Sequence, residues 1–69
     1  MQIFAQRLKE LRNEKHLTTR DLAKIIGVTN ITISRWENEK ANATHDKIIL
    51  LANYFDVSAD YLLGLKDFD

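Results

Sequence analysis

The sequence repeats one short pattern four times, and this repetition constrains the fold more than any other feature. In each copy a hydroxyl residue follows one apolar residue and precedes another by four positions. The four hydroxyl residues are Thr18, Thr29, Thr44 and Ser58. Such a residue caps the first turn of a helix, while the apolar pair packs together as a hydrophobic staple. The pattern predicts four helix starts, and the copy at Thr44 is the weakest because its leading apolar residue is only Ala43.

Apolar spacing predicts one more helix ahead of these four. Phe4, Leu8 and Leu11 recur at intervals of four and three, which makes one stripe along a helix. Gly27 suits the left-handed position that ends a helix, and a turn of only a few residues follows it. No segment alternates apolar and polar residues for long, so no strand is expected. The predicted helices cover residues 2–14, 18–26, 29–38, 44–55 and 58–63.

Composition excludes several classes of function. The chain has no cysteine, which rules out disulfides, thiolate metal sites and cysteine nucleophiles. The longest apolar run is 48–52, too short to cross a bilayer, and no signal peptide opens the chain. We therefore expect a soluble protein of the reducing cytoplasm.

The net charge of zero hides an asymmetry along the chain. Residues 1–40 carry eight Lys and Arg against five Asp and Glu, a surplus of +3. Residues 41–69 carry two against five, a balance of −3. A polyanion would therefore meet the first part, and the second part would face away from it.

The third predicted helix has an outward face that a simple bundle does not need. Ile33 and Trp36 share its inward side. The outward row combines amide, aliphatic, hydroxyl and guanidinium side chains: Asn30, Ile31, Ser34, Arg35 and Asn38. In a DNA major groove, Asn can bind adenine, Arg can fork onto guanine, and an apolar group can touch a thymine methyl. Spacing leaves open the alternative that Ile31 folds back onto the core.

Residues 17–38, LTTRDLAKIIGVTNITISRWEN, closely resemble the helix-turn-helix of phage lambda repressor and Cro-type regulators, the XRE family. With Thr19 counted as first, the packing positions five, nine, fifteen and eighteen are filled by Ala23, Gly27, Ile33 and Trp36. Segments 4–12 and 51–64 match as well. The resemblance implies an all-α, compact five-helix bundle over residues 1–69. Its helix-turn-helix core would lie at about 18–38 and its last two helices at about 44–63.

The same resemblance assigns roles to individual residues. Base-reading positions would be held by Asn30, Ile31, Ser34 and Arg35, with Thr32 assisting. Phosphate contacts, which fix register without reading sequence, would come from Thr19, Thr29, Asn38, Lys40 and Asn42. Arg12 and Glu37 match a structural ion pair between the first helix and the recognition helix.

Three residues depart from the family pattern. Thr19 stands where Gln is frequent and reaches less far towards the DNA. Glu39 replaces the usual Gly and places a negative charge near the expected phosphate backbone. Ala43 replaces the usual Pro, so the loop before the fourth helix is expected to be less rigid.

Other function classes are weaker matches. Ser, His and Asp are present, but no nucleophile–base spacing or pair of catalytic carboxylates is found, so no enzyme activity or cofactor is expected. His16 and His45 lack a ligand pattern around them, so no metal is expected. The main rival is a protein-interaction module of the same fold, of antitoxin or repressor-partner type. Six apolar residues would form either its dimer seam or the end of the core: Tyr54, Phe55, Tyr61, Leu63, Leu65 and Phe68.

The sequence thus predicts a sequence-specific, double-stranded-DNA-binding transcriptional regulator, a repressor of phage or mobile-element type. We expect it to bind an inverted-repeat operator as a homodimer that associates through its C-terminal helices. Half-site centres would then lie about 34 Å apart, one helical turn of DNA. No membrane partner is expected, and the protein would be found in the cytoplasm with the nucleoid.

Overall fold

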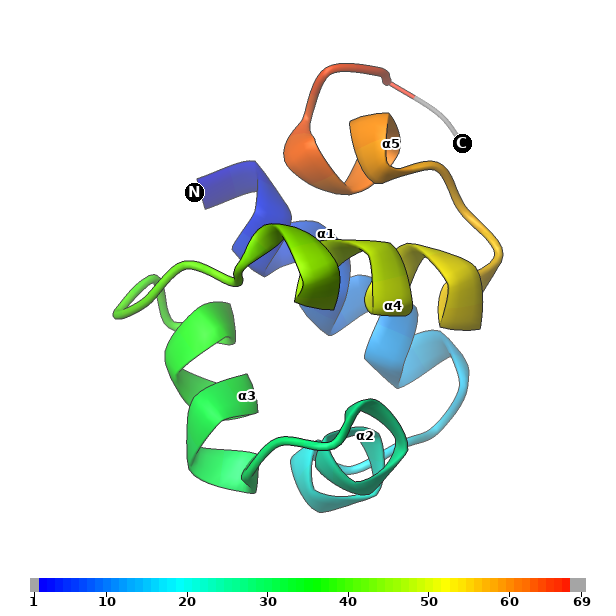
Figure 1. Cartoon of the computed structure of the whole chain (residues 1–69). Helices are drawn as coiled ribbons and strands as arrows, with labels where there is room; N and C mark the ends of the chain where they lie inside the picture. Colours follow the sequence, from blue (N-terminus) through cyan, green and yellow to red (C-terminus); the bar gives the residue numbers. More distant parts are fainter. Residues whose placement is uncertain (1, 68–69) are drawn as a thin grey trace.

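The computed structural model describes residues 2–67, and its described part consists of five helices without a strand (Figure 1). The helices are α1 (Gln2–Glu14), α2 (Thr19–Ile26), α3 (Asn30–Glu37), α4 (His45–Phe55) and α5 (Ala59–Leu63). The expected all-α, five-helix fold is confirmed. In Figure 1, α2 and α3 occupy one end of the molecule and α5 the other. None of the described helices is long and apolar enough to span a membrane.

Three of the four predicted helix caps form as expected. The side chains of Thr18, Thr29 and Ser58 accept hydrogen bonds from backbone N–H groups in the first turns of α2, α3 and α5. At Thr18 the bond is reciprocal, because the Asp21 carboxylate accepts from the Thr18 backbone N–H at 2.9 Å. Each capped helix begins one residue later than predicted, since the cap residue itself keeps an extended backbone.

Thr44 is the exception. It occupies the cap position of α4 with extended backbone, but its side chain makes no capping bond. Its hydroxyl donates instead to Asp46 Oδ1 at 2.6 Å. This charge-assisted hydrogen bond fixes the orientation of the Thr44 side chain, and in that orientation Oγ1 accepts no bond from the first turn of α4. This bond is also the main reason why the pKa of Asp46 is lowered.

Among residues 2–67, five residues adopt the left-handed backbone region, four between helices and one after α5. Gly27 has φ 86° and ends α2 as predicted, and Gly64 has φ 83° after α5. Three residues with side chains adopt the same region, namely His16, Glu39 and Asp56, with φ between 56° and 61°. The third predicted helix also ends one residue earlier than expected, at Glu37, because Asn38 is the C-cap and lies outside α3.

The core lies where the helices converge. Six side chains are almost wholly buried: Phe4, Leu8, Leu22, Ile33, Leu51 and Leu62. Trp36 packs edge-on against Phe4, with the ring centroids 6.3 Å apart, and joins α3 to α1. Burial of one such side chain stabilises the fold by about 1.5–3 kcal/mol. The inward face predicted for the third helix is therefore confirmed by Ile33 and Trp36.

The end of the described chain is fastened to α1 by Arg7. The guanidinium group of Arg7 donates to the backbone oxygens of Tyr61 and Lys66. It also lies over the Tyr61 ring, 4.2 Å from the centroid. Next to this contact, a Cβ built on Gly64 would stand only 3.0 Å from an Ile3 methyl. Glycine therefore allows the close approach of this turn to α1 as well as its left-handed conformation.

Of the six apolar C-terminal residues predicted to form either a dimer seam or the end of the core, some are part of the core and others are exposed. Phe55 is buried in the core and the half-buried Tyr54 packs against it, whereas the half-buried Tyr61 lies under the Arg7 guanidinium group. Leu63 and Leu65 are 38% and 73% exposed. Phe68 lies outside the described residues.

Candidate nucleic-acid interface

The outward side of α3 is the most distinctive surface of the molecule. Ile33 and Trp36 anchor the inward side, so the helix cannot rotate without exposing them. Ile31 is 66% exposed, and the alternative in which it folds back onto the core is therefore wrong. Arg35 is exposed as well, while Asn30 and Ser34 are partly exposed on the same helix. The structure thus places these four predicted base-reading side chains within reach of solvent.

At the start of α3, two threonine hydroxyls are linked. Thr29 Oγ1 accepts from the Thr32 backbone N–H at 3.2 Å and lies 3.0 Å from Thr32 Oγ1. Thr29 is therefore occupied with the helix start while remaining exposed, and Thr32 is held beside it. Both hydroxyls can still accept or donate one further bond.

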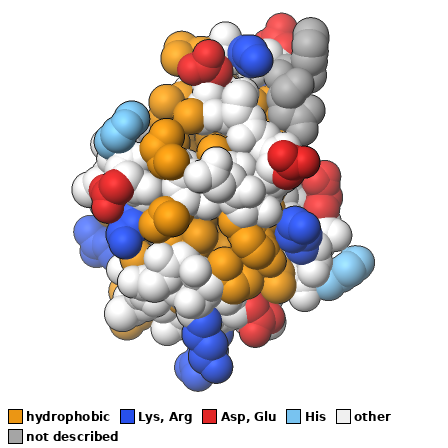
Figure 2. Space-filling view, turned by 45° about the vertical axis from the view of Figure 1, so that its right-hand side comes forward, with side chains coloured by type: hydrophobic (Ala, Val, Ile, Leu, Met, Phe, Trp, Pro, Cys, Tyr) orange, Lys and Arg blue, Asp and Glu red, His pale blue; other side chains and the backbone are white. Residues whose placement is uncertain are grey.

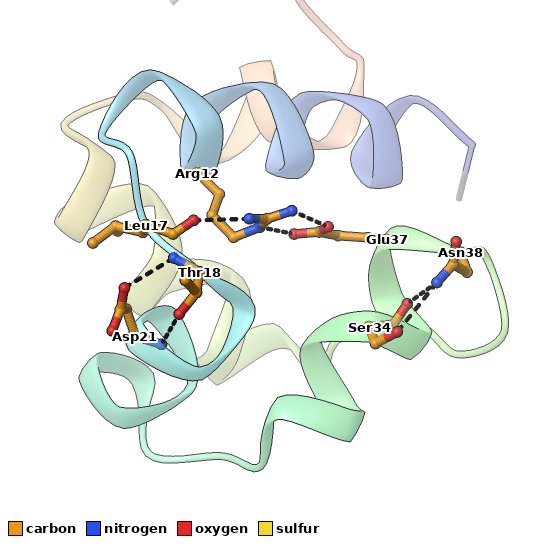
Figure 3. A network of polar contacts seen from close by, with 7 residues as sticks. All are labelled: Arg12, Leu17, Thr18, Asp21, Ser34, Glu37 and Asn38. Carbon is orange, nitrogen blue, oxygen red and sulfur yellow. Dashed lines mark hydrogen bonds and ion pairs between the residues drawn. The ribbon is translucent and has the colours of Figure 1, made fainter.

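At the end of α3, Asn38 turns back onto Ser34 (Figure 3). The Asn38 amide nitrogen Nδ2 donates to the Ser34 backbone oxygen at 2.8 Å and to Ser34 Oγ at 3.2 Å. The backbone N–H of Asn38 also donates to the Ser34 oxygen, at 2.9 Å. Ser34 and Asn38, predicted to have different roles, therefore form one unit.

The loop between α3 and α4 carries two of the predicted phosphate contacts, Lys40 and Asn42, both exposed. The Arg35 guanidinium group reaches over this loop and donates to the Lys40 backbone oxygen at 3.3 Å. At that length the bond is weak, so Arg35 can leave it for another acceptor.

Lys47 is a further candidate binding residue that the sequence motifs did not indicate. Lys47, in the first turn of α4, lines a shallow hollow together with Thr32, Arg35 and Asn42. The sequence did contain a signal for Lys47. This residue closely follows the loop with the expected phosphate contacts Lys40 and Asn42, so it lies on the same side of the molecule as that loop.

A second hollow between α2 and α3 holds two more cations. It is lined by Arg20 and Lys24 from α2 and by Asn30 from α3. Thr19, the first residue of α2, is half-buried. Arg20 and Lys24 are exposed and were not singled out either; their spacing of four along α2 puts both on one face.

A nearly buried ion pair fixes α3 against α1 (Figure 3). Arg12 Nε and NH2 lie 2.7 Å and 2.9 Å from the two carboxylate oxygens of Glu37. Arg12 NH1 donates to the Leu17 backbone oxygen at 2.8 Å, in the loop that leads to α2. Side-chain exposure is only 12% for Arg12 and 6% for Glu37. The hydrogen bond to Glu37 raises the pKa of Arg12 further above its ordinary value.

Within residues 2–67, no three His, Asp or Glu residues are grouped so that they could hold a metal ion. What the surface offers is a protruding helix with hydrogen-bonding and apolar side chains, flanked on both sides by cations. This arrangement matches a polyanion whose edges carry donors, acceptors and methyl groups.

Comparison with known proteins agrees with this geometry. A family profile described as helix-turn-helix matches residues 8–62. The chain is 40% identical over 94% of its length to the HTH-type transcriptional regulator YobD of Bacillus subtilis, an uncharacterized protein of which it covers 58%. It is 29% identical to repressor protein C2 of Salmonella phage P22 over 90% of its length, and there covers 29% of the relative. The chain thus spans well under two thirds of these relatives.

Solved structures give the same result. The P22 c2 repressor protein, in complex with a synthetic operator, superposes with a TM-score of 0.83 at 27% identity. That match covers 90% of this chain and 94% of the other. Fold, packing positions and family profile agree over most of the molecule. The chain belongs to the helix-turn-helix family of the lambda repressor and Cro type.

Proposed function

We propose that this chain binds double-stranded DNA in a sequence-specific manner and acts as a transcriptional repressor of phage or mobile-element type. The observation that carries the proposal is the 66% exposure of Ile31 on a helix whose opposite side is buried through Ile33 and Trp36. An exposed isoleucine beside an amide and a guanidinium group suits thymine, adenine and guanine edges in a major groove. The similarity to a repressor seen with its operator supports the same function.

The proposed contacts fall into two sets. Base edges are read by residues on α3, namely Asn30, Ile31, Ser34 and Arg35, with Thr32 assisting. Phosphates are contacted around them by Thr19, Thr29, Lys40 and Asn42, to which the structure adds Arg20, Lys24 and Lys47 as candidates. The flanking cations place the DNA backbone on both sides of α3, and this fixes the helix in the groove.

We further propose that two copies bind an inverted repeat through the α4–α5 end. Exposed apolar side chains lie on α4 and at the end of the described chain: Ile49, Leu50, Leu63 and Leu65. In Figure 2, apolar side chains gather at the centre of the visible face, with charged side chains around its margin. Burying such a surface against its copy is favourable and leaves α3 of each copy free. The DNA partner would place the protein in the cytoplasm, with the nucleoid.

Selection of bound sites from random duplexes tests the function, and two variants divide the contacts. Arg35→Ala is expected to cost about 1–3 kcal/mol on the selected site and to relax the preference at one base pair. Lys40→Ala is expected to weaken all sequences alike and to reduce the salt dependence by about one phosphate contact. Equal losses on selected and random DNA for Arg35→Ala would assign that residue to the backbone instead.

The interaction-module alternative makes the opposite prediction about salt. Specific DNA binding weakens steeply with ionic strength because counterions are released from the phosphates, whereas docking through apolar side chains changes little. If no sequence is enriched and no salt-dependent binding to duplex DNA is found, the proposed function is wrong.

The dimer is tested by measuring mass in solution. Leu63→Ser combined with Leu65→Ser should shift the protein towards monomer and lower affinity for the full inverted repeat more than for one half-site. Ile31→Ser is the matched control, because it also removes an exposed apolar side chain but should leave the mass unchanged. A wild-type protein that fills the full site as independent monomers would contradict the dimer.

A further inference from the structure

In the contact between Asn38 and Ser34, the direction of the hydrogen bonds shows which end of the Asn38 amide faces Ser34. The Ser34 backbone oxygen can only accept a hydrogen bond, so the Asn38 atom 2.8 Å from it must be the amide nitrogen. The same nitrogen lies 3.2 Å from Ser34 Oγ. In Figure 3 the Asn38 oxygen lies on the side away from Ser34. The amide therefore donates inwards, and only its acceptor oxygen faces outwards.

This polarity disfavours a phosphate contact through the Asn38 side chain. A phosphate oxygen needs a donor, and the outward Asn38 atom is a carbonyl oxygen, which repels it. The other phosphate candidates on the adjoining loop present donors, since Lys40 carries an ammonium group and Asn42 an exposed amide. Asn38 differs from them because its nitrogen is already committed within its own helix end.

The same contact limits what Ser34 can do. A serine hydroxyl is ordinarily able to donate or to accept, so by itself it distinguishes base edges poorly. Here Ser34 Oγ accepts a hydrogen bond from Asn38. Its own proton makes no hydrogen bond to any of residues 2–67. The bond from Asn38 polarises the hydroxyl, which makes its proton the stronger free group.

We propose that Asn38 is a positioning residue that turns Ser34 into a proton donor for base recognition. The proposal rests on the DNA-binding function proposed above and deepens it. Ser34 should then favour acceptors in the major groove, which are N7 and O6 of guanine, N7 of adenine and O4 of thymine. It should favour these acceptors over the cytosine amino group, because the bond from Asn38 already occupies one of the two lone pairs of Oγ and strengthens its proton as a donor.

The test compares Ser34→Ala, Asn38→Ala and the double variant on the selected site and all its single-base variants. Asn38→Ala should lower discrimination at one base pair by about three- to tenfold, as one hydrogen bond would. The base pair should be the one affected by Ser34→Ala, and the double variant should lose no more than the larger single loss. Discrimination is the ratio of the affinities for two duplexes, so a weakened helix end that lowers both affinities equally does not change it.

Asn42→Ala is the matched control, since it removes the same side chain from an exposed loop position. It should weaken all duplexes alike and leave discrimination unchanged. If Asn38→Ala behaves in the same way, or affects a base pair that Ser34→Ala does not, the positioning role is wrong while the DNA-binding function stands. If the wild-type protein enriches no sequence at all, the DNA-binding function itself fails, and the positioning role fails with it.

Discussion

An arginine of α1 holds neighbouring segments together at each end of this molecule, but the two arginines bind different partners. At the α2–α3 end, Arg12 is nearly buried and forks onto the Glu37 carboxylate. At the α5 end, Arg7 is partly exposed and holds backbone oxygens of Tyr61 and Lys66. The first is a contact between two charges that fixes the orientation of α3, and the second fastens the chain end to α1. The proposed reading helix is thus held by the contact that is more costly to break.

Arg12→Ala should give the largest effect, because it leaves the Glu37 carboxylate nearly buried without a partner. We expect a loss of about 3 kcal/mol in the free energy of unfolding, measured by chemical denaturation. Arg12→Lys should lie between this variant and wild type, because an ammonium group cannot fork onto both oxygens. A loss as small as that of an ordinary surface substitution would show that α3 does not depend on this pair.

Arg7→Ala should have a smaller effect at the other end of the molecule. Two hydrogen bonds from a charged group and the contact with the Tyr61 ring are lost, at a cost of about 1–2 kcal/mol. Base preference on the selected DNA site should stay unchanged, since no proposed DNA contact lies near Arg7. A changed base preference would mean that the two ends are coupled.

Glu39→Gly tests for backbone strain at the α2–α3 end, where Glu39 occupies the left-handed region at φ 61°. Removing its Cβ should stabilise the protein by about 0.5–1 kcal/mol. Glu39→Gln is the control, because it removes the charge and keeps the strained conformation. Both variants should bind DNA more tightly, because both remove a negative charge near the phosphates. Only Glu39→Gly should have a higher free energy of unfolding than wild type. Equal stabilities of the two variants would show that the backbone at Glu39 is not strained.

Asp21→Asn should give the smallest effect, and one that depends on pH. Hydrogen bonds from the backbone and side chain of Thr18 hold the pKa of Asp21 below its ordinary value of 3.8. A lowered folded-state pKa adds stability above the unfolded value, and this is lost as pH falls through the folded value. Wild type and Asp21→Asn should therefore differ in thermal stability near neutral pH and converge in acid, once the pH falls through the lowered folded-state pKa of Asp21. A difference that persists at lower pH would contradict the role of the carboxylate.

Local chemistry made much of the fold predictable from the sequence. Caps at Thr18, Thr29 and Ser58 depend on atoms a few residues apart, so their spacing was sufficient to place three helices. Thr44 makes no capping bond with its side chain, whose hydroxyl is oriented towards the Asp46 carboxylate instead. That orientation depends on side-chain geometry, and residue type alone does not decide it.

The candidate interface was predictable only in part. Residue spacing left two possibilities for Ile31, exposure to solvent or packing against the core. Only the three-dimensional structure decides between them, in favour of exposure. The Arg7 contact joins residues 54 and 59 positions apart, and no local pattern announces it. Lys47 and Arg20 were overlooked because their place beside α3 depends on how neighbouring helices pack.

The central claim is that the outward side of α3 meets the bases while the α5 end does not. Backbone amide spectra recorded during titration with the selected duplex test it most directly. We expect the largest shifts on residues 29–42 and at the start of α2, with residues around Arg7 and Tyr61 nearly unchanged. Shifts concentrated at the α5 end, with α3 unaffected, would contradict it.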